Sequence, residues 1–175
     1  MNARAVALLG LMLLSLLEIT LGQASTPTPT AEELANGRRL MEQAETEWAH
    51  ARVAVDTAHF EKALAADFYA QLPDKRISRK EFIDVISHSR PGANLTRFDN
   101  RVLTVHKDGD HWSGLILEKL EFEIKAPDGK STTTYALFVT RDGFGQVGGE
   151  WKFLFSEVLG SQAWRNGERP PFQDW

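Results

Sequence analysis

The stretch that decides the fold runs from Glu45 to Phe82 and reads ETEWAHARVAVDTAHFEKALAADFYAQLPDKRISRKEF. It predicts the end of a long helix, a short helix, an aromatic turn and the start of a third helix. From Leu95 onward the apolar residues tend to recur at every second position, which is typical of β-strands. Three helices followed by strands predict an α+β fold, with the helices packed in a curved antiparallel sheet of four or more strands.

The first predicted helix begins after Thr30, where Thr30 and Glu33 can form a capping box. Its apolar residues are spaced to form one stripe along the helix: Leu34, Gly37, Met41, Ala44, Trp48, Ala51 and Val55. The charged residues of this helix are expected to lie largely off that stripe: Arg38, Arg39, Glu42, Glu45 and Arg52. So long a stripe requires a broad apolar surface to cover.

Two further helices are indicated by their start signals. We interpret Asp56 as the N-cap of a short helix over 57–65, rather than as a catalytic base. The sequence Asp67-Phe68-Tyr69 then leads into an irregular turn near Pro73. A second capping box, Ser78 to Glu81, opens the third helix, which is expected to end at Pro91-Gly92.

The strands are predicted over 96–106, 111–125, 131–141 and 150–159, joined by turns that contain glycine. The run from Asp142 to Gly149 is rich in glycine. It is expected to link two strands rather than a strand and a helix, so it lacks the arrangement of a phosphate-binding loop. We expect it to be a flexible hairpin loop.

The N-terminal residues have the pattern of a secretory signal peptide over 1–24. Arg4 precedes an apolar run from Ala5 to Leu17, and Gly22-Gln23-Ala24 supplies a small-residue cleavage site. A Thr/Pro linker follows over 25–30, then a single domain over 31–160 and a C-terminal tail over 161–175. The expected location is therefore periplasmic or extracellular, without membrane attachment after cleavage.

The amino-acid composition limits what this protein is expected to bind. The net charge is −4 and we find no cluster of Lys and Arg, which argues against binding to nucleic acid. The chain has no cysteine, which excludes disulfides and thiolate metal sites. Its five histidines do not have a metal-ligand spacing, so no metal and no cofactor are predicted.

At this point several segments resemble the nuclear transport factor 2-like superfamily, and most closely its SnoaL-like branch. The similar segments are the helix around Trp48, the Asp56 that follows it, the Ala66-Asp67-Phe68 turn, the Ser78–Phe82 helix start and the Gly149–Phe153 strand. The resemblance implies a cone-shaped sheet with a pocket, and a homodimer formed through the outer face of the sheet. Members include a steroid isomerase, polyketide cyclases, a dehydratase and non-catalytic binding modules, so the fold alone does not imply one activity.

Candidate catalytic residues are carboxylates on apolar strand faces. Glu118 shares a face with Trp112 on the second strand, and Glu157 continues the face of Phe155 on the last strand. The resemblance also implies a polar pocket residue at the position of Glu157, and places Asp67 at the mouth of the cone. Inward carboxylates would have raised pKa values and could move a proton. The alternative, that a bulge or strand end exposes Glu118 and Glu157 to solvent, stays open.

Candidate ligand-contacting residues are aromatic: Trp48, Phe68, Tyr69, Trp112 and Phe155. Trp48 is primarily a core residue by its place in the stripe, and the Tyr69 hydroxyl either lines the mouth or points into water. Two functions follow. One is an exported binding protein that holds a small, partly apolar molecule in the cone. The other is an isomerase, cyclase or dehydratase that uses a pocket carboxylate. Carboxylates facing each other inside the cone would favour the enzyme.

Overall fold

A computed structural model of the chain describes residues 28–88, 93–126, 128–165, 168 and 170. The predicted signal peptide, the start of the linker, the helix stop at Pro91-Gly92 and most of the C-terminal tail lie outside these residues. Among the helices in the described ranges, none has both the length and the apolar composition needed to cross a membrane.

The three helices begin where the sequence predicts. Helix α1 (Ala31–Ala54) starts with the Thr30 capping box, in which Glu33 N–H donates to the Thr30 hydroxyl at 3.2 Å and Thr30 N–H donates to Glu33 at 2.8 Å. Asp56 caps α2 (Thr57–Ala63) by accepting from His59 N–H at 3.0 Å. The box of Ser78 and Glu81 starts α3 (Arg79–Ser87). These caps satisfy backbone donors locally, so the sequence alone reveals them.

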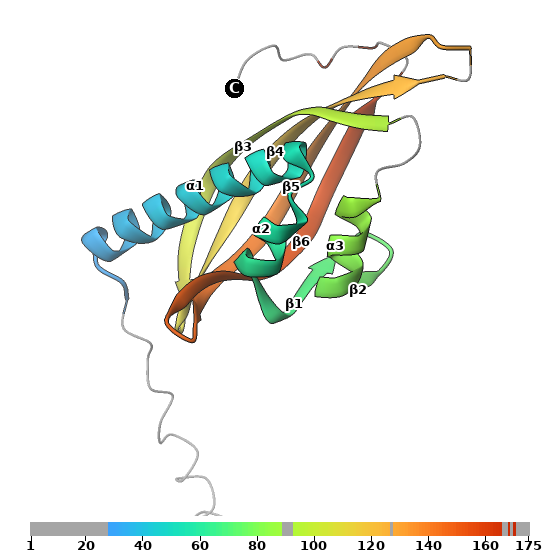
Figure 1. The fold of residues 1–175 in the computed structure, drawn as a ribbon. Coiled ribbons are helices and arrows are strands. Elements are labelled where there is room, and N and C mark those ends of the chain that lie inside the picture. Colours follow the sequence, from blue (N-terminus) through green and yellow to red (C-terminus); the bar gives the residue numbers. More distant parts are fainter. Residues whose placement is uncertain (1–27, 89–92, 127, 166–167, 169, 171–175) are drawn as a thin grey trace, which may run out of the picture.

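The sheet has six strands in the order β2-β1-β6-β5-β4-β3 (Figure 1). Their bounds are β1 (Leu64–Gln71), β2 (Arg76–Ser78), β3 (Ala93–Asp108), β4 (His111–Lys125), β5 (Ser131–Val147) and β6 (Glu150–Trp164). All neighbours pair antiparallel except β1 and β6, which are parallel. The helices lie on one face of this curved sheet, with α1 packed along β3. The predicted α+β class and cone are confirmed.

Three strand predictions were wrong in detail. The segment from Leu64 to Gln71 forms β1 instead of a helix end and turn, because it pairs with β6. The predicted loop 142–149 is strand up to Val147, and the chain turns at Gly148 and Gly149, whose φ angles are 62° and 85°. The last strand also continues beyond the predicted domain end at 160, as far as Trp164.

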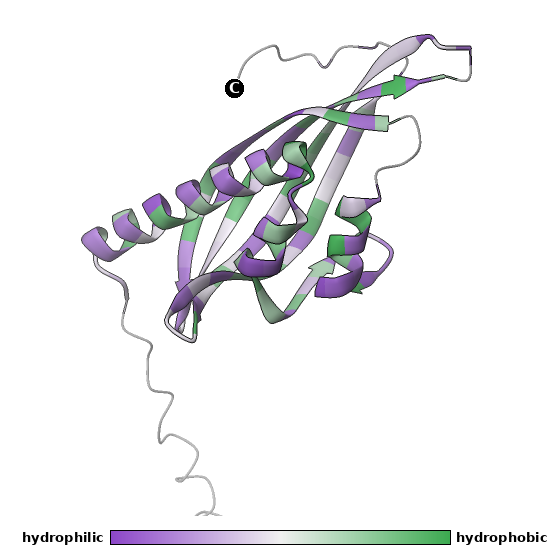
Figure 2. Cartoon of the chain, viewed as in Figure 1, coloured by the Kyte–Doolittle hydropathy of each residue, from purple (hydrophilic) through white to green (hydrophobic). Residues whose placement is uncertain are grey.

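The core lies between α1 and the inner face of the sheet. Trp48 is 4% exposed and contacts Phe60 and Phe153 with ring centroids 5.1 and 4.7 Å away. Nearer the helix start, a Cβ at Gly37 would lie 2.6 Å from the Trp112 ring, so only glycine lets α1 approach the sheet this closely. Hydrophilic and hydrophobic residues alternate along α1 (Figure 2), as expected of a helix with one face on a sheet.

Candidate functional site

A bulge at Leu154 of β6 determines which side chains enter the cone. Phe153 pairs with Phe144, but Phe155 pairs with Gly143, so one extra residue of β6 is accommodated between them. Phe153 therefore lies in the core, whereas Phe155 and Glu157 lie on the outer face of the sheet. The predicted inward direction of Glu157 and Phe155 was wrong, because strict alternation does not survive a bulge.

Glu157 is paired with side chains of the outer face. One carboxylate oxygen accepts from the Tyr69 hydroxyl at 3.0 Å, and the other accepts from Arg141 Nε at 2.9 Å. The Tyr69 ring stacks on Phe155 with centroids 5.7 Å apart, and the Arg76 guanidinium lies 3.3 Å from the Tyr69 ring centroid. Burial and the bond to Glu157 raise the pKa of Tyr69. This arrangement is a structural ion pair and places none of its members inside the cone.

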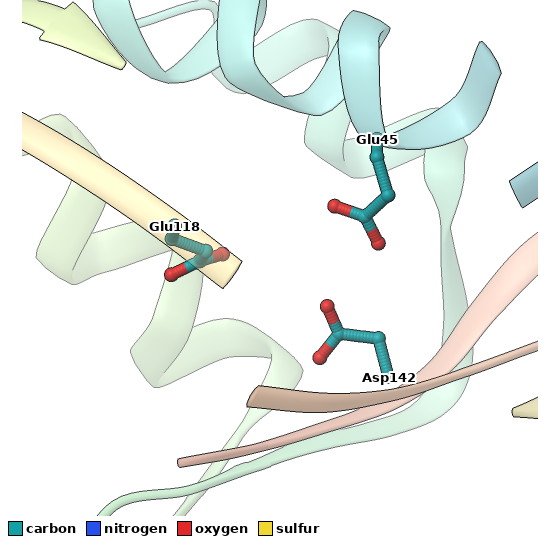
Figure 3. A group of neighbouring side chains, drawn as sticks. All are labelled: Glu45, Glu118 and Asp142. Carbon is teal, nitrogen blue, oxygen red and sulfur yellow. The ribbon is translucent and has the colours of Figure 1, made fainter. Parts of the chain in front are cut away.

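The same bulge turns Ser156 inward, opposite Asp142 of β5, which faces the cone by regular alternation and meets two further carboxyl groups there. Figure 3 shows Glu45 of α1, Glu118 of β4 and Asp142 of β5 with their carboxyl groups directed toward one another. One oxygen from each lies within 4.8 Å of the others. We call these three residues the acidic cluster. Glu118 therefore lies on the inner face, whereas Glu157 does not.

Two members of the acidic cluster are almost inaccessible to water. Glu45 is 1% exposed and Asp142 is 2% exposed. Asn100 donates to Glu45 Oε2 at 3.2 Å, and the Thr140 hydroxyl donates to Asp142 Oδ2 at 3.2 Å. The remaining oxygens, Glu45 Oε1 and Asp142 Oδ1, are buried without a hydrogen-bond partner. Leaving a buried polar atom unpaired is costly. These two oxygens therefore require a partner, either a proton or a bound cation.

Burial raises the pKa of all three groups. Desolvation, followed by the charges of Asp142 and Glu118, raises the pKa of Glu45 well above its ordinary value. The pKa of Glu118 rises to about 8, chiefly through desolvation and then through the charge of Asp142. Desolvation also raises the pKa of Asp142 to about 6, although hydrogen bonds from Ser156, Glu45 and Thr140 oppose the rise. At neutral pH, Glu45 and Glu118 therefore hold protons more firmly than Asp142 does.

Protons account for the unpaired oxygens. Protonated Glu45 can donate to Asp142, which pairs both oxygens at once, and this bond is among the causes that raise the pKa of Glu45 and lower that of Asp142. The spacing of the three carboxyl groups would also suit a cation coordinated by oxygen. The raised pKa values favour the proton, because a cation requires ionised ligands.

The other predicted residues lie apart from the acidic cluster. Trp48 and Phe68 are 4% and 2% exposed in the core, and Trp112 is 7% exposed beneath the first half of α1. Asp67 is exposed and lines an outer groove of about 570 Å³ with Tyr69 and Arg76. Within the described residues, Glu118 is thus the one predicted site residue that belongs to the cluster.

Comparison with known proteins identifies the fold. The sequence matches no family model and no curated protein. Among solved structures, an NTF2-like protein from Cytophaga hutchinsonii aligns with a TM-score of 0.55 at 15% identity, covering 69% of this chain and 95% of that one. An NTF2-like protein of unknown function in nutrient uptake from Rhodospirillum rubrum aligns with a TM-score of 0.52 at 17% identity, covering 67% and 95%. The chain has the nuclear transport factor 2-like (NTF2-like) fold.

A third solved structure agrees, a protein from Kribbella flavida with a TM-score of 0.58 at 8% identity that covers 73% of this chain and 94% of that one. At such low sequence identities, the structural similarity shows a shared fold but does not imply a shared activity. In this NTF2-like chain, the function must therefore be argued from its own residues.

Sequence reasoning missed two of the three cluster residues. Glu45 was expected off the apolar stripe, but it lies at helical spacing from Met41 and Trp48 of that stripe and is buried with them against the concave sheet of the NTF2-like fold. Asp142 was assigned to a loop because glycines follow it. A signal was present for Glu45: a charged residue between Met41 and Trp48 faces the same side as both of them.

Proposed function

We propose that this protein is a proton-transfer enzyme of the isomerase, cyclase or dehydratase kind, with Glu118 as its acid/base. One observation carries the proposal: three carboxyl groups face one another inside the cone, and two of their buried oxygens lack partners. Facing carboxyl groups are the arrangement that distinguishes acid/base chemistry from simple apolar binding. The SnoaL-like resemblance is consistent with this class of reaction and stays a prediction.

Glu118 is the member of the cluster that a substrate can contact. It is half-buried, whereas Glu45 and Asp142 are buried. With a pKa of about 8, roughly one-tenth of Glu118 is ionised at neutral pH, so both its basic and its acidic form are available. Ionised Glu118 takes a proton from a carbon next to a carbonyl group, and neutral Glu118 returns it to another atom of the same molecule. The reaction needs no other reactant.

Glu45 and Asp142 act as positioning residues behind Glu118. The charge of Asp142 is a cause of the high Glu118 pKa, and Glu45 supplies the hydrogen that pairs Asp142. Asn100 holds Glu45 in turn, by donating to its side chain and to its backbone oxygen at 2.5 Å. Removal of either acid should therefore change the pH at which Glu118 works, in addition to its rate.

A second candidate function is non-catalytic binding of a small, partly apolar molecule. The observation that favours it is a row of apolar side chains facing the cone on either side of Glu118 along β4 and β5: Ile116, Leu120, Phe122, Ala136 and Phe138 are buried or half-buried. In this case Glu118 would donate a hydrogen bond to the ligand without moving a proton.

The test is deuterium exchange at carbon. The purified protein is incubated in heavy water with small ketones that carry an aromatic or aliphatic group, and exchange is followed by NMR. We expect exchange that falls at least about a hundredfold in Glu118→Gln, because general acid–base catalysis contributes about 10²–10⁴. Glu123→Gln, on the outer face of the same strand, is the matched control and should not change the rate.

Two results would overturn the acid/base role proposed for Glu118. Ketones that bind, with shifted protein resonances but without exchange, would establish the binding function instead. Exchange that disappears with a chelator and returns with added magnesium, calcium or zinc would assign the acidic cluster to a cation. Neither result is expected if the unpaired oxygens are paired by a proton.

Export and dimerisation belong to the proposal as well. The signal-peptide pattern over 1–24 supports export, and it would place the enzyme outside the cytoplasm. The outer face of the sheet supports dimerisation, since half-buried Leu115, Leu117 and Val139 lie there among polar residues.

A further inference from the structure

Arg52 lies on the side of α1 that carries Glu45. The two are seven residues apart, which is nearly two full helical turns, so they share a face of the helix. Arg52 is in the last turn of α1 and its side chain is half-buried. Its guanidinium carbon lies 5.9 Å from the centroid of the Phe82 ring of α3. The Arg52 side chain thus extends from the end of α1 toward Phe82 of α3, about two helical turns beyond Glu45 of the acidic cluster.

Among the residues that the structure describes, the N–H donors of Arg52 have no acceptor. Other arginines use theirs: Arg38 donates to the backbone oxygens of Val102 and Leu103, and Arg141 pairs with Glu157. Within 28–88, 93–126 and 128–165, no acceptor receives a hydrogen bond from Arg52, and no carboxylate lies within 4.0 Å of it. A half-buried guanidinium whose N–H donors have no acceptor among these residues is suited to a flat, singly charged acceptor.

Arg52 also acts electrostatically on Glu118. Its positive charge lowers the Glu118 pKa, against the larger effect of burial, and the Glu118 charge in turn supports the charged form of Arg52. The two groups are therefore neighbours that do not form a salt bridge. Because Glu118 mostly holds its proton at neutral pH, it leaves the charge of Arg52 largely uncompensated, and the negative charge of the cluster is mainly that of Asp142. A single added negative charge can then approach Arg52, whereas a doubly charged phosphate would be disfavoured.

We propose that Arg52 binds the carboxylate of the substrate, so that the substrate is a small organic acid with an apolar body. The inference rests on the proposed function, because it places the carbonyl-bearing part of that acid at Glu118. The guanidinium fork matches a carboxylate in a two-bond arrangement, and the Phe82 ring lies beside the guanidinium, 5.9 Å from its central carbon. Arg52 thereby becomes the residue that selects acids over their neutral analogues.

The test compares two probes of the same shape, hydrocinnamate and its neutral amide. Binding to the purified protein is measured by calorimetry at neutral pH. We expect the carboxylate to bind about tenfold or more tighter than the amide, the preference that a charge-assisted hydrogen bond supplies. Arg52→Gln should abolish this preference, and Arg52→Lys should retain part of it, since lysine keeps the charge and loses the fork.

Arg101→Gln is the matched control, because Arg101 is an exposed arginine on β3 that pairs opposite Leu117 of the outer face. It should leave the preference unchanged, and thermal melting shows that each variant is folded. Equal binding of acid and amide, or an Arg52→Gln variant that keeps the preference, would overturn the inference. So would the absence of binding by either probe at millimolar concentration.

This inference and the proposed function can fail separately. If hydrocinnamate binding depends on Arg52 but no ketone or keto acid undergoes exchange, Arg52 is a carboxylate site in a binding protein and the enzyme proposal fails. If exchange depends on Glu118, but a keto acid exchanges no faster than a neutral ketone of the same shape and Arg52→Gln slows neither, the enzyme proposal stands and the carboxylate site is wrong.

Discussion

Replacing Glu118 by glutamine should make the folded protein less sensitive to rising pH. In the unfolded chain, a glutamic acid ionises near its ordinary pKa of 4.5, whereas the folded protein holds the Glu118 proton until its pKa of about 8. Between these values the folded state binds more protons than the unfolded state. Its stability must then fall as pH rises, being complete below pH 4.5 and lost by about pH 8.

The size of the effect follows from the pKa difference. One pKa unit corresponds to about 1.36 kcal/mol, so ionisation of Glu118 in the unfolded chain should remove about 3 kcal/mol of unfolding free energy between pH 4.5 and pH 7. Glutamine has nearly the same shape and does not ionise. Relative to the unmodified protein, Glu118→Gln should therefore become more stable by about 3 kcal/mol over the same interval.

The assay is urea denaturation at several pH values between 4.5 and 8, followed by tryptophan fluorescence, with Trp48 in the core as a natural reporter. Glu123→Gln provides the control for loss of a carboxylate on the outer face and should follow the unmodified protein. If the difference between Glu118→Gln and the unmodified protein stays constant across this range, Glu118 titrates like an exposed residue and the acidic cluster does not exist as described.

Three other outcomes are expected. Trp48→Ala should lower the unfolding free energy by about 3–5 kcal/mol, measured by urea denaturation, since it empties the centre of the core; an unchanged value would contradict the packing. Glu157→Gln should reduce stability by less than about 1 kcal/mol and leave deuterium exchange intact, because the pair with Arg141 is partly exposed. Protein recovered outside the cytoplasm should begin at Ser25 by N-terminal sequencing; an intact Met1 would argue against cleavage.

The helices could be predicted from the sequence because their signals are local. The capping boxes at Thr30 and Ser78 and the cap at Asp56 each involve residues three apart, so no distant partner is needed to recognise them. The hairpin between β3 and β4 is similar, since Gly109 has a φ of 63° at the turn. Together these signals were sufficient for the α+β class and for the order of the three helices and of the strands β3 to β6.

The sheet edge and the bulge could not be predicted, since both depend on distant partners. Leu64 to Gln71 becomes a strand only by pairing with β6, far along the chain. The glycine-rich run stays in β5 because Gly143 leaves room for the Phe155 ring, and a Cβ at Gly145 would lie only 3.0 Å from the His111 Cβ. These glycines mark places where a side chain packs closely against the strand; they do not mark a loop. The sequence alone does not distinguish these two uses of glycine.

The acidic cluster is the feature that local patterns conceal most completely. Its three members come from three elements; Glu118 alone stands out by its apolar strand face, whereas Glu45 looks like a surface charge and Asp142 like a loop residue. Burying three carboxyl groups costs stability, and well-packed apolar or amide side chains would commonly be less costly at such positions. Within the described residues, Arg52 is not bonded to the cluster, so ion pairing does not explain the burial. A costly arrangement of this kind is understandable if its protons are used, and it follows that variants which stabilise the cone at Glu118 should be the ones that lose activity.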